Sequence, residues 1–291
     1  MTKLENSSFI ACISEHGAEL KSLECKQNGR NYIYDGSAGW KRSAPVLFPN
    51  IGGLAGEKFI FDGAVLPALP HGFARDMDFV VTESDDEHAV FMLESSEETK
   101  KYFPFSFVLS ITYTLENKGI SVTWDVDNRG KTPMYFSIGA HPGFSLIEGT
   151  GLEDYDLMFD KETAIDTRRV KGRYLTDYKD HVSDKRRSIH LSPELLEKDA
   201  IILEDTGIEK LELRSKKYNY YLAIHFPDFP VVAIWTDPHQ VTNAKFICLE
   251  PWCGINSLCN DEMDDISRKN RINKLDVDQT FTRSYTISVI E

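Results

Sequence analysis

The 291-residue sequence has few features of secreted, membrane-spanning or metal-binding proteins. Its five cysteines are odd in number and form no C-x-x-C pair, which excludes an even disulfide framework and disfavours a zinc cluster. Residues 1–20 lack the basic and then apolar pattern of a signal peptide, and no run is long and apolar enough to span a membrane. These absences predict a soluble cytoplasmic protein in which most cysteines act as small buried hydrophobes.

Positive charge is also scarce. The chain has 33 Lys and Arg against 46 Asp and Glu, which gives a formal net charge of −13. Phosphate backbones and anionic membranes repel such a chain, so we expect no nucleic-acid partner and no membrane partner. The densest basic stretches, 166–174 and 183–188, are interleaved with acids and turn residues, and we interpret them as solvated loops.

Alternation of apolar and polar residues is the dominant pattern. The stretch FSFVLSITYTLE (105–116) has an apolar residue at every second position, and ISVTWDVDN (120–128) repeats this after a short turn. The pair predicts an antiparallel hairpin with one buried face. Similar patterns predict hairpins over 58–67 and 79–94, and strands within 210–226, 230–236, 244–251 and 282–290.

Helical patterns are few. The stretch SPELLEKD (192–199) offers Ser192 as an N-cap with proline in the first turn, and predicts a short helix. Residues 260–270 are a second candidate for one or two helical turns. Because no linker, repeat or low-complexity tract interrupts the chain, we predict one all-β domain over 1–291. This domain is a large antiparallel β-sandwich with a few short helices.

Two segments in the first third of the chain combine arginine with histidine or carboxylates. Arg42 precedes a short apolar strand in WKRSAPVLFPNIGGL (40–54), and taken alone it is better interpreted as a surface cation. The stretch LPHGFARDMDF (69–79) contains His71 and Arg75. The rigid guanidinium fork suits adjacent hydroxyls or an anion, but a polar loop with an Arg–Asp pair explains this segment equally well.

Two later segments each present one titratable group at the end of an apolar run. In SIGAHPGF (137–144) Pro142 keeps His141 extended, and the ordinary pKa of histidine suits proton transfer near neutrality. Without a partner, a hydrogen-bonded histidine in a turn is the better interpretation. In FICLEPWCGINS (246–257) an apolar strand should desolvate Glu250 and raise its pKa. Trp252 offers a flat face for sugar C–H groups, and a strand-end glutamate in a salt bridge is the alternative.

These motifs resemble those of the aldose 1-epimerase (galactose mutarotase-like) family. The series APVLFP, HGFARD, HPGF and EPWCG occurs in the order found in its bacterial branch, which includes the LacX-type proteins. HGAELKSL (16–23) is similar to the family's opening strand pair, so the resemblance extends over about 16–257. It implies a galactose mutarotase-like supersandwich with a sugar cleft. It also implies interconversion of the α and β anomers of an aldose without a metal or a cofactor.

The resemblance also implies roles for single residues. Glu250 corresponds to the general base and His141 to the general acid, and we expect them on opposite sides of one sugar ring. Removing a proton from the C1 hydroxyl while giving one to the ring oxygen opens the ring, and reclosure from the other face inverts the anomer. The remaining sugar contacts correspond to His71, Arg42, Arg75, Asp237 and Trp252, where Asp237 is a candidate for the family's hydroxyl-binding aspartate.

Three other functions remain open from the sequence. The HGFAR motif also occurs in family members that act on hexose 6-phosphates, and two arginines can hold a phosphate. A non-catalytic carbohydrate-binding protein would use the same aromatic residues and arginines. Glycoside hydrolysis requires two carboxylates that flank the bond, which disfavours it for a His–Glu pair. The sugar and the oligomeric state are left undefined.

Overall fold

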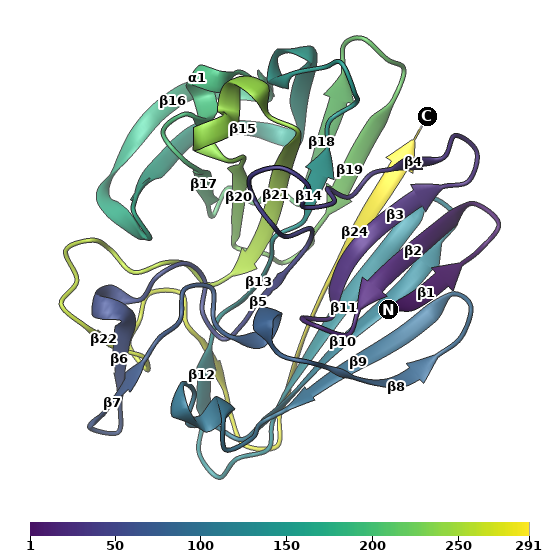
Figure 1. The fold of residues 1–291 in the computed structure, drawn as a ribbon. Coiled ribbons are helices and arrows are strands. Elements are labelled where there is room, and N and C mark those ends of the chain that lie inside the picture. Colours follow the sequence, from purple (N-terminus) through teal and green to yellow (C-terminus); the bar gives the residue numbers. More distant parts are fainter. Residues whose placement is uncertain (291) are drawn as a thin grey trace.

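The computed structural model describes residues 1–290, with the side chain of Asp264 excepted, and consists mainly of β-strands (Figure 1). Its largest sheet has nine strands. In spatial order these are β16 (Tyr174–His190), β15 (Tyr155–Lys171), β18 (Lys210–Ser215), β19 (Tyr221–His225), β24 (Thr280–Ile290), β11 (Gly119–Asn128), β10 (Phe107–Glu116), β9 (His88–Glu94) and β8 (Val80–Ser84).

A six-stranded sheet lies centrally in Figure 1 and carries the site described below. Its order is β17 (Ile201–Glu204), β20 (Val231–Trp235), β21 (Phe246–Cys253), β13 (Ile138–Ala140) and β5 (Val46–Leu47), and β14 (Gly143–Ser145) also pairs with β21. A four-stranded sheet is formed by β1 (Thr2–Glu5), β2 (Phe9–Ser14), β3 (Glu19–Cys25) and β4 (Arg30–Asn31).

The remaining elements are short. Two small sheets pair β12 (Met134–Phe136) with β23 (Asn273–Leu275), and β6 (Lys58–Phe61) with β7 (Ala64–Pro67) and β22 (Asp264–Asp265). One α-helix, α1 (Pro193–Leu196), is accompanied by the 3-10 turns η1 (Ala55–Glu57), η2 (Ala74–Asp76), η3 (Thr99–Lys101), η4 (Leu152–Asp154) and η5 (Pro238–Asn243). Over residues 1–290, no helix has the length and apolar character needed to cross a bilayer.

Successive side chains of β21 face the main core and the candidate site in turn. Ile247 and Leu249 of β21 belong to the large core, which also contains one face of the nine-stranded and four-stranded sheets. Because successive side chains point to opposite faces, Cys248, Glu250 and Trp252 lie on the other face of β21. Smaller apolar clusters that include Cys248 and Trp252 line that face.

Most sequence-based expectations for the fold are confirmed. The predicted hairpin over 105–128 is β10–β11, with buried and partly exposed residues alternating along both strands. The helix predicted over 192–199 is α1, and Ser192 Oγ accepts a hydrogen bond from Leu195 N at 3.3 Å. The chain is an antiparallel β-protein of packed sheets with few helical turns, as the alternating pattern indicates.

Two expectations are wrong. The basic stretches 166–174 and 183–188 are not loops, because they belong largely to β15 and β16, a hairpin of two 17-residue strands. Arg168 pairs with Glu204 of β17 at 3.1 Å, and Arg169 pairs with Asp180 of β16 at 2.8 Å, so both charges are held by neighbouring strands. The stretch 260–270 forms turns and the two-residue strand β22 instead of helical turns, since its Asp265 pairs with Ile60 of β6.

Candidate active site

A cavity of about 340 Å³ opens on the face of the six-stranded sheet that points away from the main core. Small-molecule sites usually have volumes of roughly 300–1,000 Å³, so this cavity can hold one small ligand. Five residues predicted from the sequence line it, although they lie up to 181 positions apart in the chain (71 to 252). They are His71, Arg75, His141, Glu250 and Trp252.

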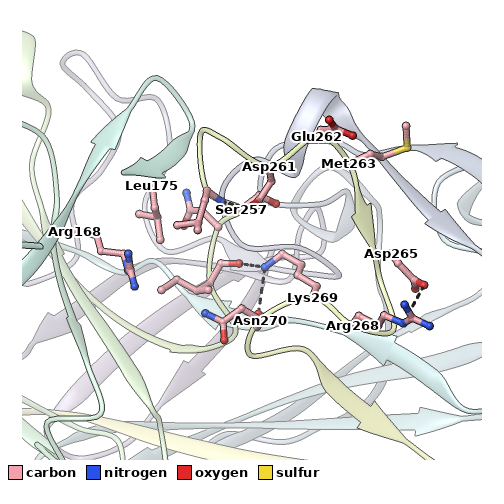
Figure 2. A pocket seen from close by; sticks show the side chains of 13 residues that line it. Arg168, Leu175, Ser257, Asp261, Glu262, Met263, Asp265, Arg268, Lys269 and Asn270 are labelled. Carbon is pink, nitrogen blue, oxygen red and sulfur yellow. Dashed lines mark hydrogen bonds and ion pairs between the residues drawn. The ribbon is translucent and has the colours of Figure 1, made fainter. Parts of the chain in front are cut away.

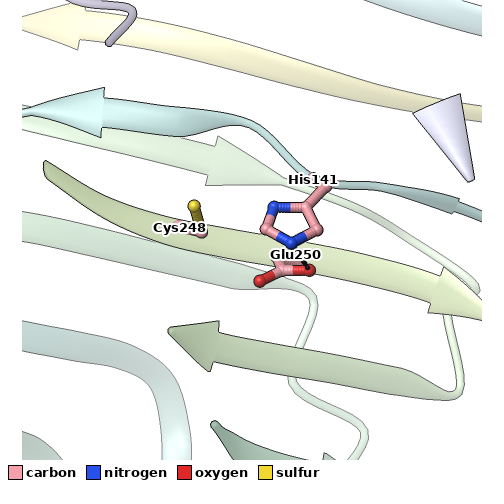
Figure 3. Close-up of side chains that lie close together, drawn as sticks. All are labelled: His141, Cys248 and Glu250. Carbon is pink, nitrogen blue, oxygen red and sulfur yellow. Dashed lines mark ion pairs between the residues drawn. The ribbon is translucent and has the colours of Figure 1, made fainter. Parts of the chain in front are cut away.

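His141 and Glu250 are in direct contact in the cavity wall. The imidazole Nε2 lies 3.3 Å from Glu250 Oε2, and the side chains are only 10% and 2% exposed. Figure 3 shows the histidine ring, which follows β13, directly above the carboxylate on β21. The two groups therefore lie side by side and not on opposite flanks of a space for a ring. Glu250 also sits within β21 and not at its end, because the strand continues through Pro251 to Cys253.

Burial favours the uncharged form of both partners. Desolvation raises the pKa of Glu250 well above its usual value, and the nearby Asp199 raises it further. Desolvation lowers the pKa of His141 well below its usual value, and the positive charge of Arg75 lowers it further. Burial therefore favours a neutral carboxyl group beside a neutral imidazole over the corresponding ion pair.

His71 and Arg75 form a second polar corner of the cavity. His71 has the left-handed backbone conformation, with φ of 62°, and its Nδ1 accepts a hydrogen bond from Gly52 N at 3.3 Å. Burial lowers the pKa of His71 to about 3, and Arg75, Arg42 and Arg173 lower it as well. Arg75 is fixed by a 2.8 Å hydrogen bond from Nη2 to the Pro70 carbonyl. The corner thus presents a neutral imidazole beside a guanidinium.

Two predicted site residues lie outside the residues that line this cavity. Arg42 binds Asp76 at 2.7 Å and the Arg75 carbonyl at 3.4 Å, so it supports Arg75 from behind. Asp237 caps η5 by accepting a 3.0 Å hydrogen bond from His239 N. In its place Asp199 lines the cavity.

Several cavity residues were missed by the sequence analysis: Trp40, Arg173, Asp199, Trp235 and Asn256. Arg173 lies at the tip of the β15–β16 hairpin, and its carbonyl accepts hydrogen bonds from Gly53 N at 2.9 Å and Asn256 Nδ2 at 3.0 Å. Asp199 has φ of 74°, which is a conformation that aspartate tolerates after a helix end. In the sequence, the available signal for Asp199 was an aspartate directly after LLEK (195–198), at the end of the predicted short helix.

Cys248 lies beside the pair, two residues before Glu250 on the same face of β21 (Figure 3). One donor atom of each of His141, Cys248 and Glu250 lies within 4.8 Å of the others. Metal ligation requires the thiolate, and full burial raises the pKa of the Cys248 thiol well above its usual value. The thiol form of Cys248 is therefore favoured beside the pair.

A second pocket, of about 320 Å³, lies between the β15–β16 hairpin, which contributes Arg168 and Leu175, and the loop over 255–270 (Figure 2). Its polar groups largely satisfy one another. Lys269 donates to the Ile255 carbonyl, Arg268 lies 3.7 Å from Asp265, and Asp261 accepts a 2.8 Å hydrogen bond from Leu258 N. These contacts stabilise the loop over 255–270. We place the candidate active site in the first cavity, because the five residues predicted from the sequence line it.

Comparison with known proteins identifies the family of this chain. Residues 1–275 match the model of the family described as aldose 1-epimerase. The chain belongs to the aldose 1-epimerase family. The plasmid-encoded protein LacX of Lactococcus lactis subsp. lactis is 30% identical over 99% of both chains.

Solved structures of other family members have the same fold. A galactose mutarotase related enzyme from Lactobacillus acidophilus has a TM-score of 0.93 and 29% identity, covering 100% of this chain and 97% of its own. A galactose mutarotase-like protein from Lactobacillus casei has a TM-score of 0.92 and 31% identity, covering 100% of both chains. The expected galactose mutarotase-like architecture is thus confirmed.

The neutral state of His71 predicts a specific acid sensitivity. Between pH 6.5 and about 3 the unfolded chain binds a proton at this residue that the folded protein does not, so stability falls as pH falls. His71→Asn keeps a side-chain acceptor for Gly52 and tolerates positive φ. On acidification from pH 7 to pH 5, the free energy of unfolding of this variant should therefore fall by up to about 2 kcal/mol less than that of wild type. Urea unfolding at the two pH values measures both changes.

The control for this measurement is His225→Asn, which removes an exposed histidine from β19, outside the cavity. It should leave the acid sensitivity of wild type nearly intact. Equal acid sensitivity of His71→Asn and wild type would show that folding does not lower the pKa of His71.

Proposed function

We propose that this protein interconverts the α and β anomers of an aldohexose by acid–base ring opening and reclosure. The observation that carries the proposal is the contact between His141 Nε2 and Glu250 Oε2, 3.3 Å apart in a cavity wall. Membership of the aldose 1-epimerase family supports the reaction class. No residue outside this pair is needed to move the two protons of the reaction.

The side-by-side arrangement suits a hemiacetal. The C1 hydroxyl oxygen and the ring oxygen are both bonded to C1, so two adjacent protein groups can reach them from the same side of the sugar. Glu250 takes the hydroxyl proton while His141 gives a proton to the ring oxygen, which breaks the bond from C1 to the ring oxygen. After rotation about C1–C2 the reverse transfers close the ring on the other face.

One proton on the pair is sufficient for a full cycle. Transfer of the resting proton from Glu250 to Nε2 of His141 produces the base and the acid together. Ring opening then returns a proton to Glu250 through the sugar, and reclosure returns one to His141. The pair ends each turnover with the proton count with which it began, so no exchange with solvent is required.

The other cavity residues suit the binding of hydroxyl groups. Asp199 supplies a partly buried carboxylate, and Asn256 has a buried Oδ1 without a hydrogen-bond partner. Arg75 and the neutral His71 supply N–H donors on the opposite side. Trp235 and Trp252 provide apolar faces for the C–H groups of a pyranose. We assign hydroxyl binding by an aspartate to Asp199 instead of Asp237.

A hexose 6-phosphate is a second candidate substrate, favoured by one observation. Arg75 and Arg173 both line the cavity, and Arg42 lies directly behind Arg75. Three guanidinium groups near one corner supply local positive potential in a chain whose net charge is −13. This corner can hold a phosphate by charge-assisted hydrogen bonds.

Exchange NMR with the purified protein tests both candidates. Saturation transfer between the anomeric protons is measured on glucose, galactose and glucose 6-phosphate at equal concentration. We expect catalysed exchange on a free hexose, and a preference for glucose 6-phosphate would instead select the second candidate. Binding of these sugars without exchange would support a carbohydrate-binding protein and overturn the proposal.

A further inference from the structure

We propose that Trp40 is a positioning residue that holds the His141 imidazole against Glu250, a role that rests on the proposed function. The two rings are stacked, with centroids 4.8 Å apart and planes at 26°. Since a histidine ring can rotate about two side-chain bonds, a stacking partner restricts the plane in which the ring lies. In this structure that plane brings Nε2 to 3.3 Å from Glu250 Oε2.

Trp40 is itself fixed by an aromatic cluster on the cavity side of the six-stranded sheet. It stacks on Phe246 with centroids 5.3 Å apart and planes at 25°, and on Tyr34 at 6.2 Å and 8°. The ring of Trp235 lies roughly perpendicular to Trp40, with centroids 5.8 Å apart, and to His141, with centroids 5.5 Å apart. The imidazole therefore contacts two indole rings, one stacked on it and one perpendicular to it.

The loop that carries Trp40 is anchored by close packing at Gly39. This glycine has φ of 71°, and a Cβ there would lie 2.4 Å from Gln240 Nε2 and 2.8 Å from Asp237 Oδ2. The loop thus rests directly on η5, whose first residues Asp237 caps. This contact gives Asp237 an indirect connection to the site, through the placement of Trp40.

The surroundings of His141 allow the role of Trp40 to be separated from electrostatics. The titratable groups that face the imidazole are Glu250 and Cys248 on β21, His71 before η2, and Arg75 on η2, with Arg42 further away. Trp40 adds no charge to this set. Replacing it should change the orientation of the ring and its exposure to water while leaving every ionisable neighbour in place.

The experiment compares Trp40→Phe, Trp40→Leu and Gly39→Ala with wild type. Gly39→Ala crowds the side-chain ends of Gln240 and Asp237 without changing Trp40, and Gly29→Ala is its control because it has a similar φ of 67° but no atom within 4 Å of the added methyl. Two quantities are measured: kcat and KM for anomer exchange, and the NMR shifts of the His141 ring protons, assigned with His141→Asn. The indole ring current reports the stacking directly.

Trp40→Leu should lower kcat roughly 10–100-fold, because misplacement of a reacting group by about 1 Å has effects of this size. KM should change less than about threefold, and the His141 ring protons should move downfield. In Trp40→Phe both kcat and the ring-proton shifts should lie close to wild type. Gly39→Ala should have a smaller effect than Trp40→Leu, because the side chains of Gln240 and Asp237 can move away from the added methyl. Gly29→Ala should resemble wild type.

Three results would overturn the role of Trp40. A raised KM with unchanged kcat would make it a sugar contact. An unchanged kcat with a lowered melting temperature would make it a packing residue. Ring-proton shifts that are insensitive to Trp40→Leu would show that the rings do not stack in solution. A wild-type protein without anomer exchange would instead refute the proposed function, while the ring-proton shifts would still show whether the stacking exists.

Discussion

Glu250→Gln is expected to reduce the rate of anomer exchange by about 10²–10⁴-fold, the range typical for removal of a positioned acid–base group. Glutamine fills the same volume and keeps a carbonyl oxygen near His141 Nε2, but it cannot accept the hydroxyl proton. The variant should still bind sugar because the other cavity residues are unchanged. Saturation-transfer NMR measures the rate, and isothermal titration calorimetry with the same sugar measures the affinity.

Glu212→Gln is the matched control for this substitution. Glu212 lies on β18 with its side chain 12% exposed, and it pairs with Lys210 at 2.8 Å, outside the cavity. Its replacement removes one partly buried carboxylate away from the cavity and should leave anomer exchange near the wild-type rate. Weakened sugar binding by Glu250→Gln with an unchanged rate would mean that Glu250 only holds a hydroxyl group.

Gly72→Ala is expected to destabilise the protein by about 3–5 kcal/mol, the upper range for single substitutions. A Cβ at this position would lie 2.0 Å from Phe48 O and 2.5 Å from Pro49 N, which are backbone atoms that cannot move aside. The Phe48 carbonyl also accepts hydrogen bonds from Phe73 N at 3.0 Å and Ala74 N at 3.1 Å. Relief of the clash would therefore break these bonds and displace His71. Urea unfolding measures the loss.

Gly63→Ala separates the clash from backbone strain. Gly63 has φ of 76°, close to the 71° of Gly72, but no atom lies within 4 Å of an added Cβ. It should cost only about 1–2 kcal/mol, the penalty of a left-handed alanine. Equal losses in the two variants would show that strain, and not the contact with Phe48, decides the effect at Gly72.

Several residues of the candidate site could be predicted because each lies in a short, recognisable sequence pattern. Glu250 and Trp252 stand at alternate positions of an apolar strand, and Pro142 directly follows His141 at the end of another. Each pattern is contained in about ten residues. Only the spatial contact between the two segments required the structure, because β13 and β21 are more than 100 positions apart in the chain.

The residues that were missed depend on long-range packing. The parts of β15 and β16 within 166–174 and 183–188 were interpreted as loops, because many of their side chains are charged and apolar alternation is weak there. Their tip reaches the cavity through hydrogen bonds to Gly53 and Asn256, which lie far away in sequence. Asp199 follows a short helix and Asp237 follows a strand, and neither local sequence shows which aspartate reaches the cavity. Only the structure shows that Asp199 lines it.

Glu250 lies in the middle of β21, and this position separates the structurally fixed part of the candidate site from the part that can vary. Its register partner is Ala233 of β20, the ends of β21 pair with β13 and β14, and Leu249 anchors the same strand in the main core. The carboxylate cannot be relocated without disrupting the sandwich. The loop over 35–42 and the hairpin tip over 171–174 border the same cavity without this restriction. Divergence toward new sugars should therefore accumulate at these two rims while the proton-transfer pair is inherited unchanged.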